Sequence, residues 1–241
     1  SIKDLSFLKL MTRFLTNRIG PTMKKEYESV ESEADITRSF VYVPLHYQPE
    51  QSTITQGDVF VDQRLFIKIL SAALPPGWFI YVKEHPYQWL ARGTSFFSLR
   101  PRGYYLSLAR LKNVRIVPIE TNTFTLIQHA KTVATVAGAA AFEAVMQRKT
   151  ALLFGHVWFQ NGPGIFKVDD VSSCKAAFDA IRSGYVVSED ELFAFLAVFD
   201  RVSFRGYLDG EWREASSLSL EDNIQNVQST LFQMLKKPAY N

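Results

Sequence analysis

The stretch FIYVKEHPYQW, residues 79–89, passes directly from an apolar run into a lysine, a carboxylate and an imidazole. Its first four residues are apolar or aromatic, which is typical of a parallel β-strand covered on both faces. Pro86 ends the strand, because proline has no N–H to donate to a neighbouring strand. The segment therefore predicts a buried strand with Lys83, Glu84 and His85 at its C-terminal end. These three residues form either a solvated turn or part of a ligand site.

Four other short runs share this apolar character, and stretches of helical periodicity lie between the runs. The further strand candidates lie at residues 39–45, 114–119, 132–136 and 150–155. The helical patterns lie near 61–74, 101–111, 122–130 and 140–148. Alternation of this kind predicts βαβ units, and therefore a Rossmann-like, doubly wound parallel sheet of the α/β class.

The composition is ordinary for a soluble globular protein: of 241 residues, 47% are hydrophobic and 21% are charged. The formal net charge of +3 gives no reason to expect a nucleic-acid partner. The one cysteine, Cys174, excludes an intramolecular disulfide and suits a reducing compartment. No apolar run approaches the roughly 20 residues of a membrane-spanning helix, and no signal peptide is visible. We therefore expect a cytoplasmic protein.

The two ends of the chain differ from the region between them. Residues 4–19 have apolar residues near helical spacing with basic residues between them, and the charged stretch KKEYESVESEADITRS, 24–39, is typical of a linker or exposed loop. We expect residues 1–37 to form a helical appendage and linker, and residues 38–241 to form the Rossmann-like domain with C-terminal helices. The N-terminal helix either packs on the protein or contacts an anionic membrane surface.

Three polar or glycine-containing segments, 46–50, 83–86 and 137–143, follow predicted strands. In doubly wound sheets, ligands bind outside the C-terminal ends of the strands, so these segments are expected to converge on one edge. In 83–86, His85 can donate to a phosphate and Lys83 can add a positive charge, while Pro86 fixes the turn. A solvent-exposed turn is the alternative.

The segment VAGAAAFEAV, 136–145, leads from a strand into a helix through Gly138, Ala139 and Ala140. Small side chains at a helix N-terminus allow backbone N–H groups to approach an anion, and the helix dipole favours negative charge there. Glu143, early in the helix, could accept hydrogen bonds from ribose hydroxyls. Tight strand-to-helix packing, with Glu143 interacting only with the dipole, is the alternative.

Two further loops contain histidine. In LHYQPEQST, 45–53, His46 and Glu50 are candidates for general acid–base chemistry, and Gln48 is a candidate for binding sugar hydroxyls. In LLFGHVWFQNGPG, 152–164, His156 is a candidate sugar contact beside aromatic residues that either stack on a ligand or belong to the core. A polar surface loop is the alternative for the first segment.

Several common motifs are absent from the sequence. It has no G-x-G-x-x-G fingerprint, GxxxxGK[ST] loop or G-x-S-x-G elbow, which argues against dinucleotide redox chemistry, P-loop chemistry and serine hydrolysis. The four histidines are too scattered for the usual structural zinc site, so we expect no metal and no cofactor.

Together, VPLHYQPEQST, VKEHP, LIQHAKTVATVAGAAAFEAV and ALLFG resemble the bacterial capsule polysaccharide biosynthesis family over about residues 38–160. That family is glycosyltransferase-like and includes Kdo transferases. The resemblance implies the C-terminal, nucleotide-sugar-binding half of a GT-B glycosyltransferase, in which two Rossmann-like domains face a cleft. An N-terminal acceptor domain would then be missing from this chain or supplied by another part of a longer protein.

Carried over by residue, the resemblance implies that His85 and Pro86 contact the donor phosphate and that Glu143 contacts the ribose. Gln48 and Glu50 match a loop that faces the sugar. The sequence departs from the family pattern at residues 139–141, which are alanines where family members often have Thr or Ser after the glycine. Only backbone donors would remain for the phosphate at that loop.

The leading hypothesis is a metal-independent glycosyltransferase domain that uses a nucleotide sugar, with CMP-Kdo favoured over UDP-sugars. Its acceptor would be a glycan or lipid-linked glycan at the inner face of the cytoplasmic membrane. His and Lys would neutralise the leaving phosphate, in agreement with the lack of an Asp-x-Asp pair. The alternatives are a non-catalytic nucleotide-sugar- or glycan-binding module and an enzyme like the UDP-sugar 2-epimerases.

Overall fold

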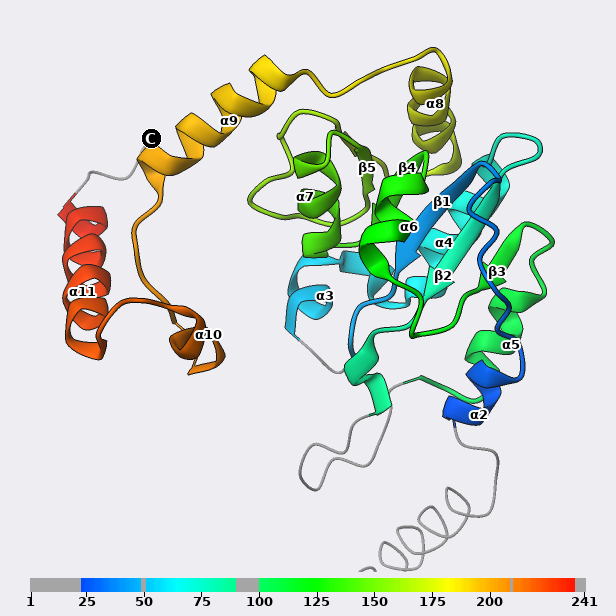
Figure 1. The fold of residues 1–241 in the computed structure, drawn as a ribbon, viewed down its shortest axis with the longest axis horizontal. Helices are drawn as coiled ribbons and strands as arrows, with labels where there is room; N and C mark the ends of the chain where they lie inside the picture. Colours follow the sequence, from blue (N-terminus) through cyan, green and yellow to red (C-terminus); the bar gives the residue numbers. More distant parts are fainter. Residues whose placement is uncertain (1–22, 49–50, 90–99, 209, 237–241) are drawn as a thin grey trace, which may run out of the picture. The chain divides into compact units, whose positions relative to one another are not determined.

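The computed structural model describes residues 23–48, 51–89, 100–208 and 210–236. The chain divides into two compact units, one ending at Glu189 and the other beginning at Asp190. The division therefore falls at residue 189, whereas the sequence predicted a boundary at residue 37 and none after it. The first unit contains the β-sheet (Figure 1).

The sheet of the first unit has six strands in the order β3-β2-β1-β4-β5-β6, and every neighbouring pair is parallel. This order is that of Rossmann-type folds, so the predicted doubly wound parallel sheet is confirmed. The strands are β1 (Phe40–Pro44), β2 (Phe79–Lys83), β3 (Val114–Ile116), β4 (Thr132–Thr135), β5 (Thr150–Leu153) and β6 (Ile165–Lys167).

The point at which the strand order reverses lies between β1 and β4. From β1 the chain first adds β2 and β3 on one side, and it then returns to add β4, β5 and β6 on the other. The register aligns Val41 with both Ile80 of β2 and Thr132 of β4. Because the connections leave β1 and β4 in opposite directions, the loops after these two strands can separate and form a crevice.

Helices cover both faces of the sheet. In Figure 1, α6 (Thr123–His129) and α7 (Ala139–Met146) lie in front of the strands, and α4 (Gln63–Ala73) lies behind them. The other helical elements of this unit are α2 (Met23–Glu28), α3 (Gln51–Gln56), η1 (Asp58–Val61), η2 (Pro86–Trp89), α5 (Tyr104–Ala109) and α8 (Val171–Arg182). Helices on both faces explain why the central strands are apolar without alternation.

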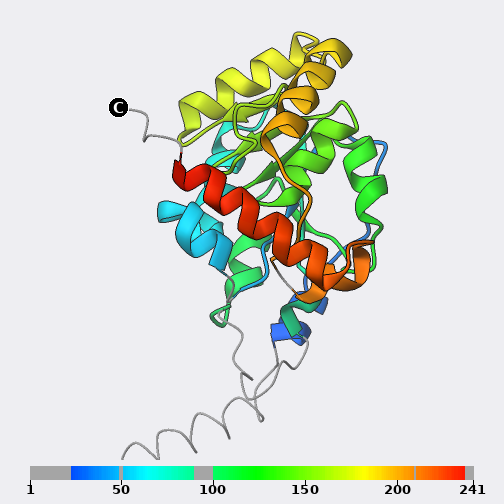
Figure 2. The ribbon, with the colours of Figure 1, turned by 90° about the vertical axis from the view of Figure 1, so that its left-hand side faces the viewer.

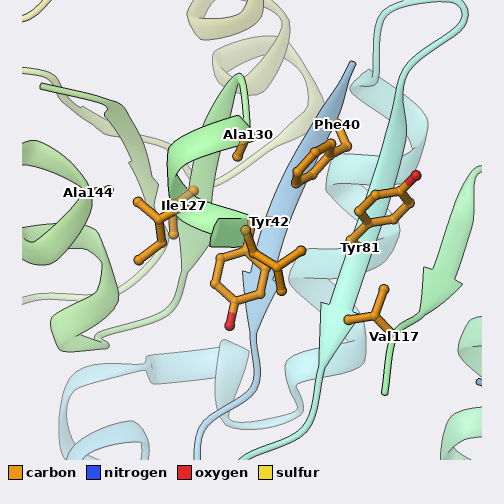
Figure 3. Close-up of a cluster of buried hydrophobic side chains, with 9 residues drawn as sticks. Phe40, Tyr42, Tyr81, Val117, Ile127, Ala130 and Ala144 are labelled. Carbon is orange, nitrogen blue, oxygen red and sulfur yellow. The ribbon is translucent and has the colours of Figure 1, made fainter. Parts of the chain in front are cut away.

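The core on the α6 and α7 face is rich in aromatic residues (Figure 3). Phe40 and Tyr81 stack with ring centroids 4.5 Å apart, and Tyr42 packs in the same buried cluster with Ile127 of α6 and Ala144 of α7. Successive strand side chains point to opposite faces, so the intervening residues of β1 and β2 contribute to the other side of the sheet. All of the β1 residues from 40 to 43 are buried.

The segment predicted as a linker packs against the first unit instead. The hydroxyl of Tyr27, a buried residue of α2, donates to the Val117 carbonyl, and Ser32 N–H donates to the Ile116 carbonyl at 2.9 Å. Glu31 forms a parallel bridge with Ile116, beside β3. The prediction was wrong for residues 23–32 because one buried tyrosine and backbone pairing anchor this charged segment. The predicted helix at residues 4–19 lies outside the described residues.

The second unit contains α10 (Gly210–Ala215), α11 (Leu220–Lys236) and nearly all of α9 (Glu189–Val202). Figure 2 shows α11 as one continuous red helix. Asn223 on α11 is buried, and its side chain bonds both the N–H and the carbonyl of Tyr207, at 2.7 and 3.0 Å. Among the helices that the structure describes, none is long and apolar enough to cross a membrane.

Candidate functional site at the carboxyl edge of the sheet

The loops that follow β1 and β4 are joined at the switch point by His46. Its Nε2 atom lies 2.9 Å from the Thr135 hydroxyl oxygen and accepts the Ala137 N–H at 3.2 Å. The Thr135 oxygen itself accepts the Gly138 N–H at 3.2 Å, and because Nε2 accepts the Ala137 N–H, the Thr135 hydroxyl is the donor toward His46. Nε2 is therefore an acceptor, and the neutral ring has its proton on Nδ1.

This arrangement gives the predicted acid–base residue a linking role. A proton on His46 Nε2 would face the N–H of Ala137, placing donor against donor. The backbone of His46 is also fixed, because its N–H donates to Gln63 Oε1 at 2.8 Å and its carbonyl accepts from Gln63 Nε2 at 3.2 Å. Gln63 is fully buried, so the loop after β1 is anchored to the start of α4.

Gly138 allows this close approach between the two loops. A methyl group at position 138 would lie 2.8 Å from Thr135 Oγ1 and 3.2 Å from His46 Cε1. Gly138 is also the N-cap residue of α7, and no side chain caps the helix there. Ala139 and Ala140 follow, so backbone N–H groups and the positive end of the helix dipole are the polar features of this turn.

Glu143 is exposed on α7, as the prediction of a ribose contact requires. Its charge acts on Tyr42 of β1, which is buried under α6 and α7. Burial, with a smaller contribution from Glu143, raises the pKa of the Tyr42 hydroxyl to about 12. Glu143 lies on the same helix as Ala139 and Ala140, and Gly138 is the residue just before that helix.

Lys83, predicted to contact a phosphate, is buried at the end of β2 and is only 6% exposed. Its ammonium group donates to the Thr121 carbonyl and to Thr123 Oγ1, the latter at 2.9 Å. Burial lowers the pKa of Lys83. Lys83 thus fixes the connection between β3 and α6, and its structural partners leave no support for a direct phosphate contact.

His85 is half-buried, and Pro86 is exposed at the start of η2. Nδ1 of His85 accepts the Tyr87 N–H at 3.1 Å, so the neutral ring has its proton on Nε2 and presents a donor. The ring of Tyr47, from the loop after β1, and the ring of Tyr87, from η2, lie beside it, with centroids 5.8 and 5.3 Å from the imidazole. The phosphate contact expected of His85 stays a prediction.

The side chain of Gln48 forms hydrogen bonds with other parts of the protein. Its side-chain oxygen accepts from Arg100, and its side-chain nitrogen donates to the Val61 carbonyl at 2.9 Å. Its backbone is paired with the side chain of Gln88, at 2.9 and 2.7 Å. The predicted contact with a sugar is therefore not supported for Gln48. Glu50, predicted as catalytic, lies outside the described residues.

His156 follows β5 and is exposed. Its Nδ1 atom lies 2.8 Å from the ammonium nitrogen of Lys167, which also donates to Gln160 Oε1 at 3.0 Å. Trp158 is 60% exposed and packs against Phe142 of α7, with ring centroids 5.2 Å apart. The aromatic residues near His156 therefore include an exposed ring as well as core residues.

The sequence analysis missed a buried ion pair between Arg100 and Glu84. Arg100 Nε lies 2.9 Å from Glu84 Oε2, and both side chains are completely buried. Tyr105 donates its hydroxyl to the same carboxylate at 2.5 Å. Arg100 follows LARGTSFFSL, 90–99, which mixes polar and apolar residues without regular alternation, so nothing in the local sequence indicated that it would be buried. Within the described residues, no group of three or more His, Cys, Asp or Glu is arranged to hold a metal ion.

A profile of the family described as "Capsule polysaccharide biosynthesis protein" matches residues 16–180. Two matching solved structures are KpsC proteins of Thermosulfurimonas dismutans. The one described as a beta Kdo 2,7 transferase is 16% identical, with TM-score 0.41, over 61% of this chain and 46% of that chain. The one described as a beta Kdo 2,4 transferase is 24% identical, with TM-score 0.39, over 58% and 44%.

A third solved structure, UDP-GlcNAc 2-epimerase from Methanocaldococcus jannaschii, is 12% identical, with TM-score 0.45, over 76% of this chain and 50% of that chain. This chain thus spans about half the length of these three structures or slightly less. A search of curated proteins finds no significant match. The family profile covers well over half of the sequence and confirms the resemblance, so this chain belongs to the capsule polysaccharide biosynthesis protein family.

Proposed function

We propose that this chain is the nucleotide-sugar-binding domain of a glycosyltransferase that builds a bacterial capsular or surface polysaccharide. The observation that carries the proposal is the switch point, where His46 holds the β1 loop against the turn that begins α7. This is where Rossmann-type sheets bind nucleotide ligands. Family membership supports a role in capsule synthesis.

The donor phosphate would bind at the first turn of α7. Gly138, Ala139 and Ala140 have no side chains that obstruct the backbone N–H groups, and the dipole favours an anion there. His85 would supply a further donor through its Nε2 proton, consistent with its acceptance of the Tyr87 N–H at Nδ1. Glu143 would accept hydrogen bonds from the ribose. A CMP-linked sugar acid such as CMP-Kdo is the favoured donor.

In the transfer, an acceptor hydroxyl oxygen would form the new bond to the anomeric carbon as the bond from that carbon to the phosphate oxygen breaks. The nucleotide phosphate would leave with the bonding electrons, stabilised by the helix N-terminus and by His85. The acceptor proton would pass to a carboxylate, for which Glu50 remains the predicted residue. The acceptor would be a glycan or lipid-linked glycan at the cytoplasmic membrane face, and an N-terminal domain would complete the cleft.

A second candidate function is a module that binds a nucleotide sugar without transferring it. The observation that favours it is the structural role of three predicted site residues, because Lys83, Gln48 and His46 all bond to other parts of the protein. Nucleotide binding without turnover in the presence of donor and acceptor would distinguish this module from the enzyme.

The proposal is tested by calorimetric titration of the chain with CMP, UDP and GDP, in parallel with His85→Ala and His129→Ala. His129 is the matched control, because it ends α6 just before β4 and so lies at the opposite edge of the sheet. Loss of one hydrogen bond to a charged phosphate removes about 1.5–3 kcal/mol, so His85→Ala should weaken CMP binding by about tenfold or more.

Each outcome of this titration has a defined meaning. Binding of CMP that is lost in His85→Ala and kept in His129→Ala supports the CMP-linked donor. Binding of UDP alone moves the donor to a UDP-sugar. Failure of all three nucleotides to bind at millimolar concentration overturns the proposed nucleotide site.

A further inference from the structure

We infer that Arg100 is a positioning residue of this site, which holds the loops after β1 and β2 in a fixed relation and sets the position of His85 through Glu84. The inference deepens the proposed function, because it names the residue on which the geometry of the predicted phosphate contact depends.

Arg100 contacts both loops at once. On the β2 side, its Nε and Nη2 atoms donate to the two oxygens of Glu84, at 2.9 and 3.0 Å. On the β1 side, Nη2 donates to the His46 carbonyl at 2.7 Å and Nη1 donates to Gln48 Oε1. The guanidinium plane also lies over Tyr104 of α5, with Cζ 4.7 Å from the ring centroid. One planar group thus connects three separate segments of the chain.

Glu84 connects Arg100 to the backbone of His85 by hydrogen bonds. Its Oε1 atom accepts the His85 N–H at 2.7 Å and the Arg100 Nη2 donor at 3.0 Å. Its Oε2 atom accepts from Arg100 Nε and from the Tyr105 hydroxyl. Its own N–H donates to the Tyr27 hydroxyl at 3.1 Å. Rotation of the carboxylate would therefore break its hydrogen bond with the backbone N–H of His85. That hydrogen bond fixes the backbone from which the imidazole projects.

The chemistry of the guanidinium explains why arginine is required at position 100. Arginine presents five N–H donors in a rigid plane, so it can satisfy a carboxylate, an amide oxygen and a carbonyl at the same time. Lysine keeps the charge but presents a single nitrogen. Both side chains of the pair are completely buried, so water does not compete for these donors. Replacement by lysine should therefore release one of the two loops.

The contacts of Arg100 separate its role from that of an ordinary buried ion pair. It donates to the carbonyl of His46, and its partner carboxylate accepts the N–H of His85, so one of its acceptors belongs to one histidine of the proposed site and another holds the backbone of the second. Arg64 offers a matched comparison. It also lies over the Tyr104 ring, with Cζ 5.4 Å from the centroid, but its carboxylate partner is Asp62 of the same turn.

The experiment compares Arg100→Lys with Arg64→Lys and with Tyr105→Phe, which removes one hydroxyl donor from Glu84 and changes no charge. Three properties are measured: the dissociation constant for CMP by calorimetry, and the hydrogen-exchange rate and proton shift of the His85 backbone amide by NMR. In Arg100→Lys we expect faster exchange of this amide, an upfield shift and CMP binding weaker by about tenfold. Tyr105→Phe should produce a smaller change of the same sign, and Arg64→Lys should produce none.

A folded Arg100→Lys protein with unchanged CMP affinity and an unchanged His85 amide would overturn the inference, even if its melting temperature fell. If Arg100→Lys does not fold, Tyr105→Phe decides the matter, and an unchanged His85 amide in that variant overturns it. If the unmodified chain binds no CMP, UDP or GDP, the proposed function fails separately. The His85 amide in the two variants then still tests the positioning role.

Discussion

The Nε2 atom of His46 lies 2.9 Å from the hydroxyl oxygen of Thr135, so one imidazole links the carboxyl ends of β1 and β4. These two strands flank the point where the strand order reverses. The loop after β1 and the turn into α7 are therefore held together at the position where a Rossmann-type sheet binds its ligand. The contact depends on an uncharged imidazole and on the absence of a side chain at Gly138.

Gly138→Ala should destabilise the fold by about 1–3 kcal/mol, the usual range for overpacking a filled site. The added methyl group would lie 2.8 Å from Thr135 Oγ1 and 3.2 Å from His46 Cε1, so the two loops would have to separate. Urea denaturation measures the loss of stability, and CMP titration measures the effect on the site. An alanine variant with unchanged stability and unchanged CMP affinity would show that the two loops tolerate separation.

Ala139→Ser should strengthen CMP binding. It places a hydroxyl directly after Gly138, at the first residue of α7, and one added hydrogen bond is worth about 0.5–1.5 kcal/mol, or about a two- to tenfold gain in affinity. Calorimetry with CMP measures the change. Gln147→Ser, at the C-cap and so at the other end of α7, serves as the control and should leave the affinity unchanged. Weaker CMP binding by Ala139→Ser would place the phosphate elsewhere.

Arg100→Met should destabilise the protein by about 3–5 kcal/mol, because it leaves the Glu84 carboxylate buried without its counter-ion. The double variant Glu84→Gln with Arg100→Met should recover part of this loss, since neither charge then remains buried. Arg64→Met is the matched control, because it breaks a partly exposed pair and should cost about 0–1 kcal/mol. Urea denaturation measures all three variants, and equal losses in the two single variants would contradict the prediction.

Stability should fall as the pH rises above 10. Burial raises the pKa of Tyr27, Tyr42, Tyr104 and Tyr105 above the ordinary value of 10.0, so unfolding at alkaline pH releases protons. The stabilisation is complete below pH 10 and is lost as the pH rises toward the folded-state pKa values. The lowered pKa values of Lys83 and Lys149 act in the opposite direction, but they are two groups against these four tyrosines.

Tyr42→Phe tests this pH dependence at one residue. Each shifted tyrosine contributes a slope of about 1.4 kcal/mol per pH unit, so the variant should lose that part of the slope between about pH 10 and 12. Urea denaturation at several alkaline pH values measures it. A Tyr42→Phe variant whose slope equals that of the unmodified protein would contradict the prediction.

Most of the strands could be predicted from the sequence, but their order in the sheet was not predicted. Strands such as β1 and β2 are buried on both faces, so their apolar runs are visible without any tertiary information. The edge strand β6 was missed because Ile165 and Phe166 are only half-buried and Lys167 is exposed. The segment around Tyr27 was missed because a single buried tyrosine in a charged stretch has no periodic pattern.

The general location of the site also followed from the sequence, since loops after parallel strands meet at one edge whatever their side chains do. The sequence thereby placed His46, His85 and Gly138 at that edge, together with the helix that begins there. Only the tertiary structure decided what each side chain bonds to. Lys83 and Gln48 look available in the sequence, yet they bond to Thr123 and Arg100, which are 40 and 52 residues further along the chain. Strand periodicity is a local property of the chain, whereas a buried hydrogen bond depends on which distant segments fold against one another.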